Sequence, residues 1–450
     1  MVVERAKVSA RKACRALPLP SVAALACAVA LAPKPAFAQC DATEETCRQV
    51  RQLAERADVQ QALAFVAEDD ERTIRDLIAL TEIPAPPFAE AARGNAFADL
   101  LREAGADSVW TDEEGNVIGL RRGSGNGPTL VVSGHLDTVF PEGTDVTVRQ
   151  TGDTLRAPGI ADDTRGLVTV LAVLRGLEAG NIGTAGDLLL VGTVGEEGLG
   201  DLRGVKHLFR DGGPNIDAFI SVDGTDDSRI THMGLGSRRY RVTFAGPGGH
   251  SWGAFGIANP AHALGRAVQL FDEAAAEFTA SGSRTSYNVG RIGGGTSVNA
   301  VPFETWMEVD MRSESPESLA GIDSIFRAVV DRALEQENAD RRRGDPLTVA
   351  VELVGDRPSG EIAADDPLVQ QAVAVTRHLG LEPELGRSST DSNVPIAKGI
   401  PSITIGGGGR GGDAHALTEW YLNTDGIRGI QRALLIALSY AGVAEGVTNP

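Results

Sequence analysis

Apolar runs alternate with amphipathic segments along the chain, and this alternation predicts strands and helices in turn. Three runs are apolar at nearly every position, which is typical of strands buried on both faces of a parallel sheet. They cover residues 129–132, 188–191 and 219–222. Helical spacing of apolar residues precedes them, at 71–80 and 89–104. We therefore predict an α/β domain with a mostly parallel sheet.

The pattern changes near Met233. Residues 239–244 alternate polar and apolar side chains with a period of two, as a half-buried strand does. A helix, two strands, a long helix and a final strand are predicted to follow, which is the βαββαβ order of a ferredoxin-like domain. The earlier pattern then resumes. We predict that residues 234–358 are a ferredoxin-like α+β domain inserted into the α/β domain, which covers 67–233 and 359–450.

The first 38 residues have a basic start, an apolar stretch from Leu19 to Ala32 and the small-x-small ending Ala36-Phe37-Ala38. This pattern is typical of a secretory signal peptide, because the apolar stretch is too short to span a bilayer. A membrane anchor is the alternative. Residues 39–66 then form a helical lead-in. We expect an exported protein, periplasmic or secreted, with no membrane attachment after cleavage.

The net charge narrows the range of binding partners, and the cysteines bear on whether the mature protein has a disulfide. The formal net charge is −19, and loss of the signal peptide, with six basic residues and one glutamate, brings it to about −24. This argues against binding to nucleic acids or to anionic membranes. Cys40 and Cys47 remain after cleavage, and export favours a disulfide between them. Two free thiols are the alternative.

Imidazoles and carboxylates follow several predicted strands, at the sheet edge where open α/β sheets bind their ligands. His135 and Asp137 stand two residues apart at the end of one strand, so both side chains point to one face. A metal-bound imidazole usually donates its other N–H to a carboxylate, and Asp137 has the right type and spacing for that. A surface histidine beside a turn aspartate would explain the same pair.

Three further segments place carboxylates in similar positions. Asp162-Asp163 lies in a glycine-flanked loop, where a carboxylate could bridge two metal ions or cap the next helix. Glu196-Glu197 follows the most apolar strand, so one carboxylate could bind metal while the other takes a proton from water. A solvated pair in a loop is the alternative. Asp223 either binds metal or forms a turn.

His415 follows a glycine-rich run at residues 406–412. The run matches G-x-G-x-x-G after a strand-like segment, but no apolar helix opens on its last glycine, so it does not indicate a dinucleotide site. A flexible loop that presents His415 at the same sheet edge fits better. Two imidazoles and three or more carboxylates there predict a metal site with nitrogen and oxygen ligands, and hence a metal-dependent hydrolase.

The ordered segments also carry a family resemblance. They are His135-Leu136-Asp137-Thr138, Asp162-Asp163, Gly195-Glu196-Glu197-Gly198, Asp223 and His415. From about residue 70 to the end, the chain resembles the co-catalytic zinc exopeptidases and aminoacylases, which include glutamate carboxypeptidase and peptidase T. The resemblance implies two Zn²⁺ ions, with Co²⁺ or Mn²⁺ as other divalent ions that could serve.

The resemblance also assigns roles. His135 and Asp223 would hold one ion. Glu197 and His415 would hold the other. Asp162 would bridge both ions, and the peptide bond between Asp162 and Asp163 would be cis. Glu196 would be the general base. Many members have a lysine two residues after the bridging aspartate. This chain has Thr164 there, followed by Arg165, so no role can be carried over for that lysine.

Within the predicted insertion, the segments 246–251 and 294–300 match the same family. The resemblance implies that the insertion mediates a homodimer, in which His250 reaches the partner's site and stabilises the oxyanion. Asn299 and Arg312 would hold the carboxylate of the substrate, since the planar fork of an arginine matches that group.

These features favour an exported di-zinc metallopeptidase that cleaves a peptide bond in small peptides, similar to peptidase T. An N-acyl amino acid deacylase is the second hypothesis. A periplasmic binder without catalysis is the third, although such a protein would be expected to lose the base or a ligand.

Overall fold

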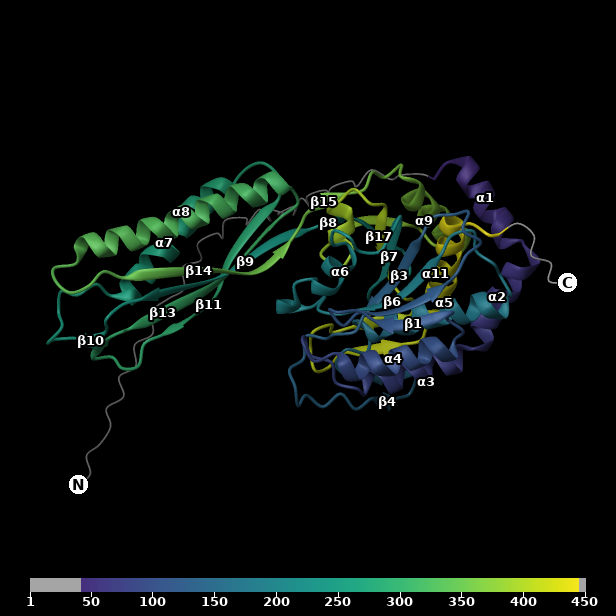
Figure 1. Ribbon diagram of the computed structural model, residues 1–450, viewed down its shortest axis with the longest axis horizontal. Helices are drawn as coiled ribbons and strands as arrows, with labels where there is room; N and C mark the ends of the chain where they lie inside the picture. The colour runs from purple at the N-terminus through teal and green to yellow at the C-terminus, as the bar shows by residue number, and fades with distance from the viewer. Residues whose placement is uncertain (1–41, 445–450) are drawn as a thin grey trace, which may run out of the picture. The chain divides into compact units, whose positions relative to one another are not determined.

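The computed structural model describes residues 42–444, so the predicted signal peptide and Cys40 lie outside the described residues. The disulfide between Cys40 and Cys47 therefore stays a prediction. Figure 1 shows the two sheet-containing parts of the described chain. Within residues 42–444, no helix combines the length and the apolar character needed to cross a membrane.

The α/β domain is built from chain segments on both sides of the insertion. The first segment contributes α1 (Glu44–Ala54), α2 (Ala57–Glu68), α3 (Asp70–Thr81), α4 (Ala91–Glu103), β1 (Ser108–Thr111), β2 (Val117–Arg121), β3 (Leu130–His135), β4 (Arg149–Thr151), β5 (Thr154–Arg156), α5 (Thr164–Ala179), β6 (Leu188–Thr193), α6 (Arg203–Leu208), β7 (Ala218–Val222) and β8 (Arg229–Gly234). The second contributes β15 (Gly360–Glu361), α9 (Pro367–His378), β16 (Glu384–Ser388), α10 (Asn393–Ala397), β17 (Ser402–Ile405), β18 (Arg410–Gly412), β19 (Trp420–Leu422) and α11 (Gly426–Ala441).

A nine-stranded sheet organises this domain, in the order β1-β2-β6-β3-β7-β17-β8-β15 with β16 on β8. The central strands β6, β3, β7 and β17 run parallel to one another. β3, β6 and β7 are buried at every residue, as their unbroken apolar runs predict. Because His135 pairs with Thr193 and Val222 with Ile405, the carboxyl ends of these strands meet at one edge.

Helices cover the sheet. α5 is buried along nearly its whole length because it contacts β3 on one side and α2, α3 and α11 on others. The lead-in is two helices rather than one, since α1 ends at Ala54 and α2 begins at Ala57. Both contribute buried side chains to the main core, and α1 contacts α9 and α11, so these helices are part of the α/β domain.

The insertion has its own sheet and its own core. Its elements are β9 (Gly236–Ala245), β10 (Gly249–His250), α7 (Pro260–Thr279), β11 (Thr285–Gly294), β12 (Ala300–Val301), β13 (Glu304–Ser313), α8 (Pro316–Asp340) and β14 (Thr348–Arg357). The antiparallel order β11-β13-β9-β14 is that of a ferredoxin-like fold, which confirms the predicted fold class. α7 and α8 lie side by side on one face of this sheet (Figure 1). The predicted face of the long helix is buried, with Phe326 at its centre.

The chain leaves and re-enters the α/β domain at neighbouring points. Gly234, the last residue of β8, pairs with Gly360, the first residue of β15. The side-chain amide of Asn393 donates to the carbonyl oxygens of Leu235 at 2.8 Å and Pro358 at 3.0 Å. Both crossings are therefore tied to α10.

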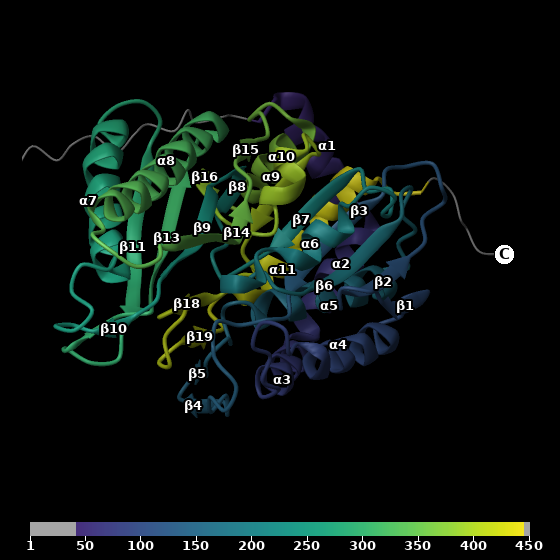
Figure 2. The ribbon, with the colours of Figure 1, turned by 60° about the vertical axis from the view of Figure 1, so that its left-hand side comes forward.

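A second, small sheet carries two loops of the site. Its order is β18-β19-β5-β4, and Figure 2 shows it beside the main sheet. The predicted flexible loop before His415 is partly strand, because Arg410–Gly412 pairs with β19. β5 leads into the loop that carries Asp162.

Candidate metal centre

The predicted imidazoles meet at the Asp162 carboxylate. His135 ends β3 and is only 2% exposed. Its Nε2 lies 3.0 Å from Asp162 Oδ1, and His415 Nε2 lies 3.2 Å from Asp162 Oδ2. Each carboxylate oxygen thus faces a different imidazole, which is the arrangement that a carboxylate bridging two cations needs.

Two more carboxylates lie at the same place. Glu197 Oε1 is 2.8 Å from His415 Nε2. Donor atoms of His135, Asp162 and Glu197 all lie within 4.8 Å of one another, close enough to hold one metal ion. Asp223 follows β7 and lines the same cavity as Asp162 and Glu197. The structure therefore links four of the predicted ligands by direct contacts and places the fifth, Asp223, on the wall of the same cavity.

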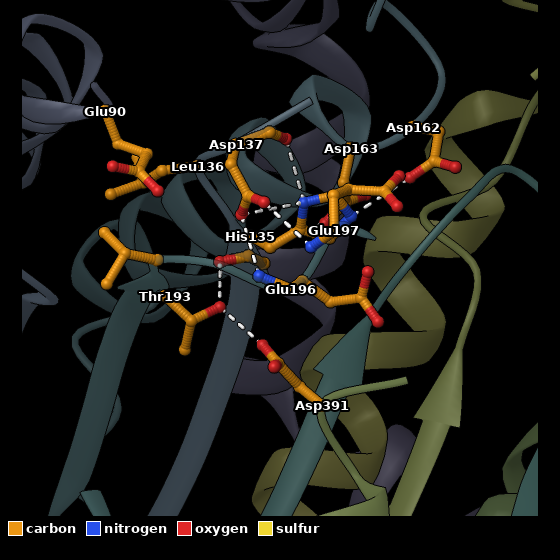
Figure 3. Close-up of polar contacts among 12 residues, drawn as sticks. Glu90, His135, Leu136, Asp137, Asp162, Asp163, Thr193, Glu196, Glu197 and Asp391 are labelled. Carbon is orange, nitrogen blue, oxygen red and sulfur yellow. Dashed lines mark hydrogen bonds and ion pairs between the residues drawn. The ribbon is translucent and has the colours of Figure 1, made fainter. Parts of the chain in front are cut away.

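Asp137 lies beside the imidazole as predicted, but its carboxylate makes shorter contacts elsewhere. His135 Nδ1 lies 3.0 Å from the backbone oxygen of Asp137 but 3.7 Å from its carboxylate. The carboxylate instead accepts the backbone N–H groups of Glu196 at 3.0 Å and Glu197 at 2.8 Å, contacts drawn in Figure 3. A carbonyl can fix an imidazole tautomer as well as a carboxylate can. Asp137 therefore shapes the glutamate loop.

The loop of Asp162 is held by a residue that the sequence did not indicate. The buried Glu419 carboxylate accepts the backbone N–H groups of Gly159, Ala161 and Asp162 at 2.8–3.0 Å. Asp163 points the other way and accepts the N–H of Gly166, so it caps α5. The peptide bond between Asp162 and Asp163 is cis, as the resemblance suggests. Metal ligand and helix cap are therefore neighbours.

Burial concentrates negative charge at the site. Desolvation, and then the Asp162 carboxylate, raise the pKa of Asp223 to about 6. Hydrogen bonds to Asp162 and Glu197 raise the pKa of His415 to about 10. Burial also raises the pKa of the Glu196 carboxyl well above its usual range, although Arg357 opposes that shift. A cation would relieve this crowding and lower all these pKa values.

The donor set fits zinc. Two imidazole nitrogens and three carboxylates are ligand types that Zn²⁺ takes, and five ligands shared by two ions leave coordination positions for water and substrate. His135 and His415 would contribute nitrogen, and Asp162, Glu197 and Asp223 would contribute oxygen.

A cavity of about 580 Å³ opens onto these ligands. Glu196 lines it beside Glu197, so the predicted base faces the same space as the predicted ligands. Four arginines line it as well: Arg229, Arg239, Arg312 and Arg357. Arg312 comes from β13 of the insertion, and its Nε donates to Asp310 at 2.8 Å. A substrate in this cavity would therefore contact both carboxylate and guanidinium groups.

His250 and Asn299 lie outside the lining of this cavity. Both are exposed, and β10 pairs His250 with Ala300, so the two residues are close to each other. Asn299 precedes the start of β13, whereas Arg312 is near the strand's end, roughly 25 Å away at the usual rise per residue. Within one chain, Asn299 and Arg312 cannot share one substrate carboxylate. That the two residues hold the substrate carboxylate together therefore stays a prediction, and it would need Asn299 from a second subunit.

Arg165, which follows the position of the family's lysine, is a structural residue here. It is buried, and it donates to the carbonyl oxygens of Gly407 at 2.9 Å and Gly426 at 2.8 Å. Two other residues near the glutamates were missed from the sequence. Asp391 accepts a hydrogen bond from Thr193 (Figure 3), and Arg357 donates to Glu196. The signal for both was weak: Asp391 is a charged residue shortly after β16, and Arg357 is the last residue of β14.

Two known enzymes are similar to this chain in sequence. Carboxypeptidase G2 of a Pseudomonas species is 24% identical over 332 residues, which span 70% of this chain and 74% of that protein. Succinyl-diaminopimelate desuccinylase of Leptothrix cholodnii is 27% identical over 311 residues, 65% of this chain and 75% of that enzyme.

The fold is likewise that of a solved peptidase. The crystal structure of aminopeptidase PepT from Bacillus cereus superimposes with a TM-score of 0.65 at 20% identity, covering 83% of this chain and 99% of that one. The sequence profile described as peptidase family M20/M25/M40 matches residues 131–438. Members of this family are metal-binding hydrolases of amide bonds. The chain belongs to peptidase family M20/M25/M40.

Proposed function

We propose that the protein is a di-zinc metallopeptidase that cleaves a peptide bond in small peptides. The observation that carries this proposal is the position of Asp162, whose two carboxylate oxygens face the Nε2 atoms of His135 and His415. One ion would lie between Asp162, His135 and Asp223. The other would lie between Asp162, Glu197 and His415.

The residues divide the reaction between them. Zinc ions would polarise the amide carbonyl and activate water. Glu196 would take a proton from the attacking water and pass it to the leaving amine. Asp137 supports this by holding the backbone of Glu196 and Glu197 through two hydrogen bonds. Arg312 would bind a free carboxylate of the substrate, because it lines the cavity and Asp310 fixes its orientation.

An N-acyl amino acid deacylase is the second candidate. The similarity to a succinyl-diaminopimelate desuccinylase supports it, since that name describes removal of an acyl group from an amine. The same residues would serve either amide. Peptidase and deacylase then differ in what occupies the cavity on the acyl side of the bond.

Export and dimerisation complete the proposal. The basic and apolar start of the chain supports export to the periplasm or the medium after cleavage near residue 38. A homodimer is supported by the exposed His250 and Asn299, which share one loop region outside the cavity. In a dimer, that region of one subunit would cover the site of the other and supply His250 to it.

The test is a hydrolysis screen with the mature, zinc-loaded protein. Dipeptides, tripeptides and N-acyl amino acids are compared, each with and without a chelator. Chelator-sensitive release of amino acids from peptides supports the peptidase. Release only from N-acyl amino acids favours the deacylase, and no hydrolysis of any substrate would leave a binding protein. Light scattering of the same sample reports whether it is a dimer.

A further inference from the structure

The loop that carries Glu196 is held from two sides. On one side, Asp137 accepts the backbone N–H groups of Glu196 and Glu197. On the other side, the two strands that connect the insertion reach the same loop. Arg239 of β9 donates to the carbonyl oxygen of Gly198 at 3.0 Å, and the backbone N–H of Asp356 donates to Asp201 at 2.8 Å. The insertion therefore contacts the loop of the proposed base directly.

Arg357, the last residue of β14, makes the most specific of these contacts. Its guanidinium donates to Glu196 Oε1 at 3.1 Å and also to the carbonyl oxygen of Glu196. Among residues 42–444, no other side chain donates to that carboxylate. Arg357 is 5% exposed and Glu196 is 5% exposed, so little water competes for this pair.

The arginine itself is fixed. The same nitrogen that reaches Glu196 also donates to Ser389 Oγ at 3.1 Å. The next residue, Pro358, accepts a hydrogen bond from Asn393, which also binds Leu235 at the other crossing. Arg357 therefore lies at the anchored point where the insertion rejoins the sheet.

We propose that Arg357 is a positioning residue for Glu196, an inference that rests on the proposed role of Glu196 as the base. A glutamate on a loop can rotate about its side-chain bonds. A guanidinium that binds one carboxylate oxygen and the carbonyl of the same residue restricts that rotation, and leaves the second oxygen for the cavity. A proton acceptor held in this way meets the attacking water in one geometry, and misplacement by about 1 Å can cost a hundredfold in rate. The insertion thereby sets the geometry of the base.

The experiment compares Arg357→Ala and Arg357→Gln with a matched control, Arg312→Ala. Arg312 lines the same cavity and comes from the same domain, but does not contact Glu196. Each variant is assayed on a tripeptide and on its C-terminal amide, and its zinc content and melting temperature are measured. Arg357→Gln keeps a long polar side chain if Arg357→Ala fails to fold.

We expect the Arg357 variants to keep their zinc and to lower kcat on the order of 10- to 100-fold on both substrates, with little change in KM. Millimolar guanidinium should restore part of the kcat of Arg357→Ala. The Arg312 variant should instead raise KM, and only for the free acid. If Arg357→Ala matches Arg312→Ala, the residue binds substrate and the positioning role is wrong.

The two proposals fail in different ways. An active wild type with unchanged kcat in Arg357→Ala removes only the positioning role. A wild type that hydrolyses neither substrate, nor any other member of the panel, removes the proposed function and this role with it.

Discussion

Two regions of this chain carry family motifs, and they differ in how they are held. At the sheet edge, His135, Glu196 and Glu197 are nearly inaccessible to solvent and are bonded by residues from distant segments. At the tip of the insertion, His250 is exposed and its Nδ1 accepts backbone N–H groups of its own loop, from Trp252 and Gly253.

The two regions also differ in how far their apolar side chains are exposed to solvent. The tip displays large apolar side chains: Trp252 is 88% exposed and Val298 is fully exposed. Strands β3, β6 and β7 beneath the sheet-edge site bury their apolar side chains, although Leu199 in the glutamate loop is 64% exposed. The predicted metal ligands and the proposed base of the first region therefore come from one chain, whereas the second region has the chemistry of a surface that acts on something outside it.

The largest effect is expected at the sheet edge. Glu196→Gln should lower kcat by about 10²–10⁴, the range for a lost general base, because the amide cannot accept the proton. Both zinc ions should remain. Glu197→Gln is the control and should lose zinc instead. Kinetics and metal analysis of the two variants check this, and the reverse pattern of metal loss would contradict the division of roles.

The next effect tests the tip. His250→Ala should keep both zinc ions and lower turnover by about 10²–10³, as loss of an oxyanion donor does. Steady-state kinetics of the purified variant measure this. Full activity would mean that the insertion tip takes no part in catalysis.

Co-expression of Glu196→Gln with His250→Ala tests whether His250 acts in the active site of a second subunit. In a mixed dimer of Glu196→Gln and His250→Ala, one site has both a normal glutamate and a normal histidine. Co-expression should therefore restore up to about a quarter of wild-type activity if subunits pair at random. Recovery that stays at the level of the separate variants would place His250 in its own subunit's site or outside catalysis.

A smaller effect is expected for substrate binding. Arg312→Ala should raise KM on the order of 10- to 100-fold for substrates with a free carboxylate, the value of charged hydrogen bonds. Substrates without that group should be almost unaffected. If KM rises equally for both, the arginine does not read the carboxylate. Asn299→Ala in the same assay reports separately on the tip.

The smallest effect concerns stability. Burial raises the pKa of Asp391 to about 6. Because this folded-state pKa exceeds the unfolded one, the group stabilises the fold below the unfolded pKa, and that contribution disappears as the pH rises to about 6. Relative to Asp391→Asn, the wild type should therefore lose on the order of 1–3 kcal/mol between pH 4.5 and 7.5. Urea unfolding of both proteins at the two pH values measures this. Parallel curves would show that Asp391 does not titrate in this range.

The sequence predicts well what depends on neighbouring residues. Unbroken apolar runs identified β3, β6 and β7, and the rule that ligands lie at strand ends placed His135 and Asp223 at one edge. The period-two strand and the long amphipathic helix likewise identified the ferredoxin-like insertion. These signals are local, since side-chain periodicity follows directly from backbone geometry.

What depends on contacts across the chain could not be predicted. Glu419 binds the N–H of Asp162 across 257 positions, and Arg357 binds Glu196 across 161. No spacing rule joins such pairs. Asp137 lies at the predicted place, with its carboxylate 3.7 Å from the His135 imidazole, but its two hydrogen bonds to backbone N–H groups could not be predicted, because only the folded loop brings those groups to it.

The paired glycines Gly234 and Gly360 have an evolutionary consequence. Through this pair, β8 and β15 are antiparallel neighbours, as the two strands of a hairpin are. The whole insertion therefore takes the place of the short turn that would join them. A gene could gain, lose or exchange this segment at one surface turn without reordering a strand of the parent domain. Modules of different size or specificity could thus be placed over one unchanged hydrolytic sheet.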